Sequence, residues 1–236
     1  MAKIEGFRIK NYRVLKDVTL GKLWNMQKAQ PLTPMTVVIG ENGVGKSSLF
    51  DAFGFLADCL KLGVEEACDA RGRGGFDRIR SQGINDPIEF HIYYKQDRNA
   101  RPITYEITID VDKTGRPYVK EERLRQRRKG VSYGRPFSFL WLYKGKGIVW
   151  KGEEVAQESD ENTASSDLSK LIEEIESAPQ KEESHATEII ELQDKRKLGI
   201  ATLGALKQHP RISAFRQFIE GWYLSYFTPD AARSLP

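Results

Sequence analysis

Apolar and polar residues alternate over two stretches near the middle of the chain, residues 88–95 (IEFHIYYK) and 103–111 (ITYEITIDV). A period of two is typical of β-strands that have one buried and one solvated face. Two aromatic segments, FSFLWLYK and GIVWKG, come later, and residues 144–147 (KGKG) between them have the composition of a hairpin loop. The pattern predicts an antiparallel meander over residues 87–151.

The N-terminal part begins with one more predicted strand, at residues 4–9, which is followed by a turn at residues 11–13 and a second short apolar segment at residues 15–20. The apolar run MTVVI (35–39) does not alternate, and continuous β-branched residues are typical of a strand buried on both faces. After a glycine-rich stretch, apolar residues recur at helical spacing at Leu49, Phe53, Leu56 and Leu60. The order strand, glycine-rich turn and helix is therefore predicted here.

Charge and hydropathy change sharply after the meander. Acidic residues greatly outnumber basic ones from Glu153 to Asp194, as in a surface segment that buries little apolar area. Only residues 168–175 and 189–192 offer apolar helical faces there, so we expect exposed helices between flexible linkers. Apolar residues return at Leu198. An amphipathic helix that docks on the sheet is predicted from Ile212, Phe215, Phe218, Ile219, Trp222, Tyr223 and Tyr226.

The glycine-rich stretch fits a phosphate-binding pattern, G-x-x-x-x-G-K-S/T, the P-loop. Its glycines let successive backbone N–H groups point at a phosphate, and the following helix adds the positive end of its dipole. The nucleotide-binding residues predicted in this way are Gly40, Glu41, Asn42, Gly43, Val44, Gly45, Lys46, Ser47 and Ser48. A glycine turn with a chance lysine is the alternative, and the flanking strand and helix patterns argue against it.

Two side chains of this stretch would contact the nucleotide and its metal. Lys46 would reach the β- and γ-phosphates, and the Ser47 hydroxyl would coordinate a Mg²⁺ that the nucleotide carries. The expected cofactors are ATP and Mg²⁺. ATP is favoured over GTP because the sequence has no N-K-x-D motif for reading guanine.

The sequence resembles the ATP-binding heads of the ABC, SMC and RecF kind, in particular RecF-like AAA family ATPases, which include anti-phage defence components. The resemblance rests on FRIKNYRVLKDVTL, on the P-loop stretch, and on GGFDRIRSQG with IEFHIYY after it. It implies an α/β fold with a P-loop NTPase core, an antiparallel β-sheet lobe and a helical insertion. It also implies that Arg13, in the N-F/Y-R/K motif, approaches the nucleotide, and a surface arginine at a turn is the alternative. The RGRGGF stretch is interpreted as a loop near the nucleotide site, and an RGG-like RNA-binding element is the alternative.

The chain departs from this family in the residues that hydrolyse ATP. Family members use an aspartate–glutamate pair at the end of an apolar strand and a signature serine from a second head, and neither motif occurs here. Glu153-Glu154 is a poor substitute because lysine and glycine interrupt the strand before it. Gln82 and Gln126 are not ranked as the γ-phosphate sensor. Hydrolysis is therefore expected to need a C-terminal half or a second ATPase head, in a homodimer or with another partner, and catalytic residues stay unassigned.

Basic residues are interleaved with aromatic ones between Arg116 and Lys151, a composition that suits nucleic-acid backbones and stacked bases. The basic residues are Lys120, Arg123, Arg125, Arg127, Arg128, Lys129, Arg135, Lys144, Lys146 and Lys151. The alternative is that Arg123, Arg125 and Arg127 form the solvated face of a strand. Contact with DNA or RNA stays open, because a net charge of +4 is too small to decide the question.

Composition indicates in which cellular compartment the protein is expected. No apolar stretch approaches the roughly 20 residues of a membrane span, and the N-terminus lacks the apolar core of a secretory signal. The two cysteines, Cys59 and Cys68, are interpreted as structural thiols, since no second pair stands at metal-ligand spacing. We expect a reduced, cytoplasmic protein without membrane contact.

We therefore expect three parts in the chain. An N-terminal ATP-binding lobe covers residues 1–151 and contains the P-loop (40–48) and the sheet (87–151). An acidic helical or flexible insertion covers 152–197, and a helical segment docking on the core covers 198–236. The expected function is the ATP-binding part of an ABC/RecF-type ATPase in DNA-related or anti-phage defence processes. The alternative is a regulatory or nucleic-acid-binding module that binds nucleotide without hydrolysing it.

Overall fold

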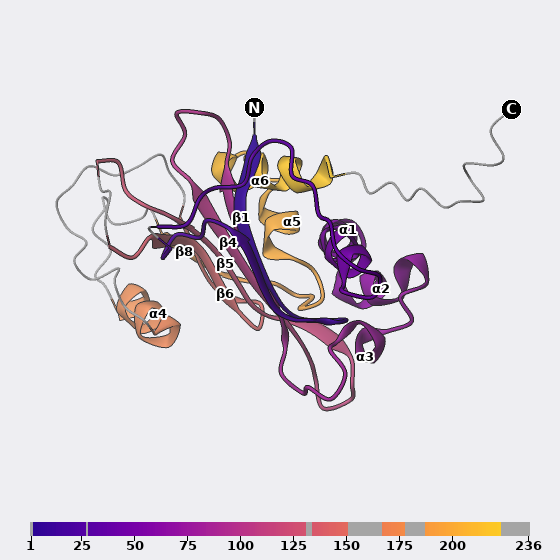
Figure 1. The fold of residues 1–236 in the computed structure, drawn as a ribbon. Helices are drawn as coiled ribbons and strands as arrows, with labels where there is room; N and C mark the ends of the chain where they lie inside the picture. The colour runs from indigo at the N-terminus through magenta and orange to yellow at the C-terminus, as the bar shows by residue number, and fades with distance from the viewer. Residues whose placement is uncertain (1, 27, 131–133, 151–166, 178–186, 223–236) are drawn as a thin grey trace, which may run out of the picture.

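The computed structural model describes residues 2–26, 28–130, 134–150, 167–177 and 187–222. An eight-stranded antiparallel sheet forms one layer, and helices pack against it (Figure 1). In the order in which they lie side by side, the strands are β2 (Leu15–Gly21), β1 (Lys3–Tyr12), β3 (Ile88–Lys95), β4 (Ile103–Val111), β5 (Pro117–Gln126), β6 (Phe137–Tyr143), β7 (Lys146–Trp150) and β8 (Thr187–Glu191).

The predicted period-two strands are observed, because alternation buries one face of each strand against the helices. β3 and β4 span the residues that the pattern gives, and β3 to β7 pair in chain order, as in a meander. The hairpin between β6 and β7 is tighter than predicted. It turns on Lys144 and Gly145, both with positive φ (51° and 84°), so Lys146 and Gly147 belong to β7. Two residues with positive φ form the turn that matches the twist of the two strands.

All of the described helices except α4 pack on one face of the sheet. The helices are α1 (Lys46–Leu62), α2 (Val64–Asp69), a 3₁₀ turn η1 (Ala70–Gly72), α3 (Phe76–Ile79), α4 (Leu168–Ser177), α5 (Gly199–Leu203) and α6 (Pro210–Glu220). The predicted amphipathic helix is confirmed as α6, in which the Phe215 ring lies 5.3 Å from that of Tyr94 and 4.9 Å from that of Tyr105. It is shorter than predicted, because α6 ends at Glu220 and Trp222 lies beyond it. Tyr223 and Tyr226 lie outside the described residues.

Helix α4 lies apart from the other helices, at the β6–β8 end of the sheet (Figure 1). Leu168 of α4 packs with Trp141 and Ile148, whereas the neighbouring Leu140 and Leu142 belong to the main core. Because successive strand residues point to opposite faces, α4 covers the face opposite to the main helical layer.

The strand predicted for residues 35–39 is wrong. These residues form no strand, and the exposed fractions of Met35, Val37 and Ile39 are 81%, 71% and 88%. A strand buried on both faces needs neighbours that complete its ladder and cover it. All eight strands of the described residues belong to one sheet, and residues 35–39 pair with none of them. An apolar, β-branched composition is therefore not sufficient to make residues 35–39 a buried strand.

The helical face predicted for residues 189–192 is also wrong. Residues 187–191 form β8, which pairs with β7 through Ile189 opposite Ile148. The open edge of β7 supplies backbone partners, and Ile189 joins the small cluster of Trp141 and Leu168. The division of the chain into three parts stays a prediction.

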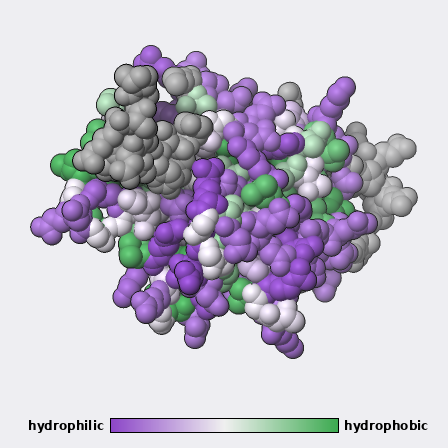
Figure 2. All heavy atoms as spheres, turned by 90° about the vertical axis from the view of Figure 1, so that its right-hand side faces the viewer, coloured by the Kyte–Doolittle hydropathy of each residue, from purple (hydrophilic) through white to green (hydrophobic). Residues whose placement is uncertain are grey.

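No helix among the described residues combines the length and the hydropathy that a bilayer span needs. Seen from the side that carries α1, α2 and α3, the surface is mainly hydrophilic with small hydrophobic areas (Figure 2). The thiols of Cys59 and Cys68 are free and buried in the core. Burial raises the pKa of both thiols, that of Cys68 to about 12, so both are held in the protonated form.

Candidate nucleotide-binding site

The predicted P-loop residues form one tight turn that leads directly into α1. Gly43 and Gly45 adopt positive φ values of 86° and 103°, a region that L side chains rarely adopt. The bond from the Leu49 N–H to the Gly45 carbonyl (2.9 Å) is the first helical bond of α1. The N–H groups of the preceding residues point outward from the helix start, since the first turn of any α-helix lacks intrahelical acceptors. This geometry fits the cradle that a phosphate requires.

The Lys46 ammonium lies over this turn. Its Nζ donates to the Gly40 carbonyl at 2.7 Å and to the Glu41 carbonyl at 2.6 Å. An ammonium has three donors, so two bonds to the loop leave one for a ligand. The Ser47 side chain beside it is exposed. A lysine held in this way fits the triphosphate of a nucleotide, and an exposed serine hydroxyl fits the Mg²⁺ bound to it.

The turn between β1 and β2 packs against the P-loop. A Cβ atom added at Gly45 would lie 2.9 Å from Val14 Cγ2 and 3.0 Å from Leu15 Cδ2. The turn itself is fixed from the other side, because the Arg13 N–H donates to the Ile79 carbonyl at 2.7 Å. The structure therefore places the turn that carries Arg13 beside the P-loop, and the approach of Arg13 to a nucleotide stays a prediction.

Asp51, one turn into α1, joins the two segments. Its Oδ2 atom accepts a hydrogen bond from the Tyr12 hydroxyl at 2.7 Å and pairs with Arg13 Nη2 at 3.0 Å. Burial raises the pKa of Tyr12, and the nearby Asp51 charge raises it further. Tyr12 thus acts as a permanent donor to the carboxylate.

Arg73 holds the helix from the RGRGGF loop. Its side chain is fully buried, and it donates to Asp51 Oδ1 at 3.1 Å and to Asp58 Oδ2 at 2.7 Å. Burial alone would raise the pKa of Asp58, but hydrogen bonds from Arg71 and Arg73 outweigh it and lower that pKa. Burial alone would likewise lower the pKa of Arg73, but its bonds to the two carboxylates outweigh it and raise that pKa. Asp58 and Arg73 therefore stay charged at neutral pH.

This buried network is the part of the site that sequence reasoning missed. The structure places the RGRGGF stretch against α1, and its position near a nucleotide stays a prediction. Nothing local in the sequence identified Asp51 or Asp58 as its partners. The sequence did contain a signal for the network. Two aspartates stand among the buried apolar positions of α1, and a buried carboxylate needs a cation beside it.

The structure separates the two glutamines that the sequence left unranked. The Ser81 N–H donates to the Asn11 carbonyl at 3.0 Å, so Gln82 follows a residue fixed beside the β1–β2 turn and the P-loop. Gln126 lies at the other end of the sheet, where its Nε2 donates to the Arg101 carbonyl at 3.0 Å. Glu153 and Glu154 lie outside the described residues.

Several basic residues between Arg116 and Lys151 are paired or buried in the sheet. Lys120 pairs with Asp110 at 3.0 Å, and Arg125 pairs with Glu106 at 3.2 Å. The Arg123 guanidinium lies 3.4 Å from the centre of the Trp141 ring, and burial together with the charge of Arg125 lowers its pKa to about 10. Arg123 and Arg125 are only 8% and 5% exposed, so the interpretation of these residues as a solvated strand face is wrong.

The glycine turn and the lysine over it have the geometry of a P-loop, and together with the family match they define the class of the protein: it is a P-loop ATPase domain of the AAA type, for which ATP binding is expected. A family model supports this class over residues 35–236, which include the whole P-loop. The chain belongs to the family described as "AAA domain, putative AbiEii toxin, Type IV TA system". No curated protein matches the chain. Strands β1 and β2 precede the matched region.

Proposed function

We propose that this chain is the ATP-binding part of an ABC/RecF-type ATPase, in which hydrolysis needs residues from a second ATPase head or a C-terminal half. The observation that carries this proposal is the convergence of Gly45, Lys46 and Arg13 at one turn. Membership of an AAA family supports ATP as the nucleotide. The ABC/RecF subtype rests on the sequence resemblance and on the contact between the β1–β2 turn and the P-loop.

Each residue of the turn has a proposed role. The N–H groups of residues 43–48 bind the phosphates, Lys46 bridges the β- and γ-phosphates, and Ser47 coordinates Mg²⁺. Arg13, oriented by Asp51, contacts the phosphates or the base. Gln82 rather than Gln126 senses the γ-phosphate, because only Gln82 stands on the P-loop side of the sheet.

An apolar surface beside the P-loop supports the need for an added lobe. Residues 35–39 are largely exposed, and they border a cavity of about 360 Å³. Apolar side chains of that cavity include Leu32, Val38, Leu49, Phe50, Phe53 and Phe218. Exposed contiguous apolar surface is typical of an interface. The occupant that we propose is a strand of the second lobe that lies beside residues 35–39. It would be an apolar strand ending in an Asp-Glu pair, a combination that does not occur in this sequence.

The cellular role that we propose is anti-phage defence or a related DNA process. The family description, which names an AbiEii toxin of a type IV toxin–antitoxin system, supports it. A nucleotide-binding regulatory module that never hydrolyses ATP is the second candidate. It is favoured by the absence of an Asp-Glu strand and a signature motif from the sequence.

Calorimetric titration of the 236-residue chain with Mg-ATP tests nucleotide binding. Lys46→Ala is expected to weaken binding at least about tenfold, because it removes a charged donor to the phosphates. Lys61→Ala, which removes an exposed lysine at the far end of the same helix, is the matched control and should bind as the wild type does. Equal binding by all three proteins would contradict the P-loop assignment.

Steady-state hydrolysis at rising protein concentration tests the need for a second lobe. The expected result is no turnover above that of Lys46→Ala. A rate that rises faster than linearly with protein concentration, and that Lys46→Ala abolishes, would show that the chain supplies its own catalytic carboxylate on dimerising.

A further inference from the structure

Basic residues gather at one end of the sheet. The loops between β3 and β4 and between β5 and β6 meet there, because Arg101 Nη1 donates to the Arg127 carbonyl at 2.6 Å. Their described residues contain one acidic residue, Asp97, and six basic ones, Arg98, Arg101, Arg127, Arg128, Lys129 and Arg135. Such a surplus of positive charge attracts a polyanion.

A cavity of about 340 Å³ opens between these loops. The described residues that line it include three arginines (101, 127 and 128), the aromatic residues Trp24 and Tyr93, and the hydroxyl-bearing Thr104, and none of them is acidic. Ligand sites usually begin at about 300 Å³. The cavity therefore has the size and the charge for one phosphorylated, ring-bearing group.

The Arg127 guanidinium is held in place by hydrogen bonds that do not neutralise its charge. Arg127 donates from Nε to the Gly134 carbonyl at 3.2 Å and from Nη2 to the Trp24 carbonyl at 3.1 Å. Both acceptors are uncharged, so these bonds fix the side chain and leave its positive charge available to an anion.

The charge of Arg127 also reaches the inner wall. Burial raises the pKa of Tyr93, and the Arg127 charge acts in the opposite direction. Arg127 and Tyr93 both line the cavity, so the cation and the phenol ring belong to one site.

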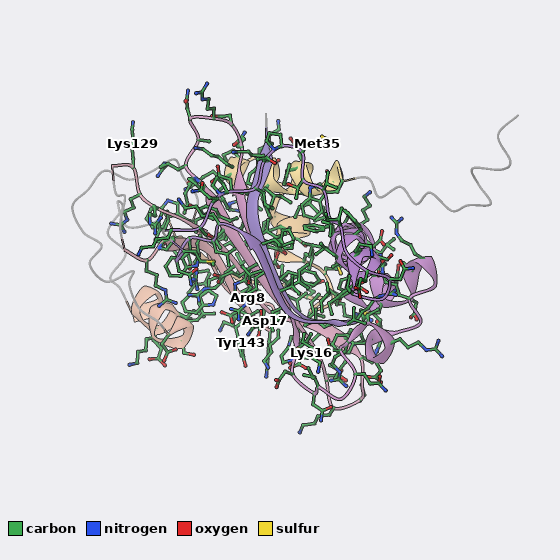
Figure 3. All side chains as sticks on the ribbon, viewed as in Figure 1. Arg8, Lys16, Asp17, Met35, Lys129 and Tyr143 are labelled. Carbon is green, nitrogen blue, oxygen red and sulfur yellow. The ribbon has the colours of Figure 1, made fainter. Side chains whose placement is uncertain are left out.

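The site is separate from the P-loop. β1 is 10 residues long, so its two ends lie about 30 Å apart along the strand. Tyr94 of β3, next to Tyr93, pairs with Ile4 at the start of β1, whereas the P-loop packs on the turn that follows Tyr12. Figure 3 shows Lys129 and Lys16 at opposite ends of the molecule, with Lys16 just after that turn. This inference does not depend on the proposed ATP site.

We propose that this arginine–aromatic cavity binds one nucleotide of a single-stranded nucleic acid. The arginines hold its phosphate, and the base lies against Trp24. Arg98, Lys129 and Arg135, which are exposed outside the cavity, contact adjacent phosphates of the strand. A single strand fits better than a duplex, because a cavity of this size takes one unstacked base and a duplex keeps its bases stacked.

The test is fluorescence anisotropy of labelled oligothymidine and oligouridine with the 236-residue chain carrying Lys46→Ala, so that the P-loop does not contribute. In that background Arg127→Gln is expected to weaken binding about tenfold and to reduce the salt slope by about one. Trp24→Ala should weaken it, and Trp24→Phe should restore most of the affinity.

Matched controls separate loss of the site from loss of folding. Arg78→Gln removes an exposed arginine on α3, and Lys113→Ala removes an exposed lysine of the β4–β5 turn. Both should bind as the parent does. Lys129→Ala, an exposed change that leaves the Arg127 bonds intact, should weaken binding about threefold.

Two further outcomes show whether the ligand is a nucleic-acid strand or a free nucleotide, and which result overturns the proposal. Binding of AMP as tight as that of the oligomer, with the same dependence on Arg127 and Trp24, would support the cavity and assign it to a free nucleotide. Binding that Arg127→Gln, Trp24→Ala and Lys129→Ala leave unchanged, or no binding at about 50 mM salt, would overturn the proposal.

Discussion

Arg13 and Asp51 are joined by an ion pair of 3.0 Å that ties the β1–β2 turn to the helix after the P-loop. The Asp51 side chain is 9% exposed, and Tyr12 and Arg73 donate to it as well. A carboxylate that is buried and shared in this way is costly to disturb, because each donor left without it is also buried or partly buried. The position of Arg13 beside the P-loop is therefore fixed by tertiary contacts.

Asp51→Asn is expected to lower the free energy of unfolding by about 2 to 3 kcal/mol, because it leaves the buried Arg73 with one carboxylate instead of two. It should also weaken Mg-ATP binding by releasing Arg13. Urea unfolding and calorimetric titration measure the two effects. Asp17→Asn, which breaks the exposed ion pair with Arg8, is the control and should cost at most about 1 kcal/mol. Equal losses in the two variants would contradict the role given to Asp51.

Gly45→Ala is expected to abolish measurable Mg-ATP binding and to destabilise the chain by about 1 to 3 kcal/mol. Its φ of 103° strains any L side chain, and the new methyl would meet Val14 and Leu15. Gly43→Ala has a similar φ of 86° but no atom within 4 Å of the added carbon. It should therefore show a smaller loss of stability. If Gly43→Ala destabilises the chain as much as Gly45→Ala does, contact with the β1–β2 turn is not the cause.

The stability of the chain should fall as pH rises from about 4.5 to about 7, through Glu122. This residue is fully buried, and burial raises its pKa to about 7 although the Tyr105 hydroxyl and the Ile200 N–H donate to its Oε1. The folded chain then holds a proton that the unfolded chain has released, so Glu122 favours folding most below pH 4.5. Up to about 3 kcal/mol of that stabilisation is lost as pH rises through 7.

Urea unfolding at several pH values checks this dependence on Glu122. Glu122→Gln should flatten the fall in stability between pH 5 and pH 8, and the exposed Glu191→Gln should leave it unchanged. An identical slope in Glu122→Gln and the wild type would rule out Glu122 as its source.

Ile39→Asp is expected to change the free energy of unfolding of this chain by no more than about 0.5 kcal/mol, because the side chain is 88% exposed. Ile92→Asp, at a position 1% exposed in the core of β3, should cost more than about 4 kcal/mol. Chemical unfolding compares the two. A large loss in Ile39→Asp would mean that residues 35–39 are packed within this chain and would remove the support for an added strand.

Much of the sheet was predictable because its signal is local. β3 and β4 follow from strict alternation, and the P-loop follows from a contiguous pattern in which glycine permits the positive φ values that the turn requires. The errors fall where the same composition suits two environments. Residues 35–39 have the sequence of a buried strand without the neighbours that bury it, and residues 187–191 form a strand because the edge of β7 offers backbone partners.

By itself the sequence determined the phosphate-binding turn, the helix after it and the strands of the meander, since each is set by residues close together in the chain. Only the tertiary structure decided that Arg13 and Arg73 share Asp51, that Arg123 and Arg125 are buried, and that Arg101 meets Arg127. Those contacts join distant segments, and their stability depends on burial and charge that exist only after the sheet and the helices have packed together.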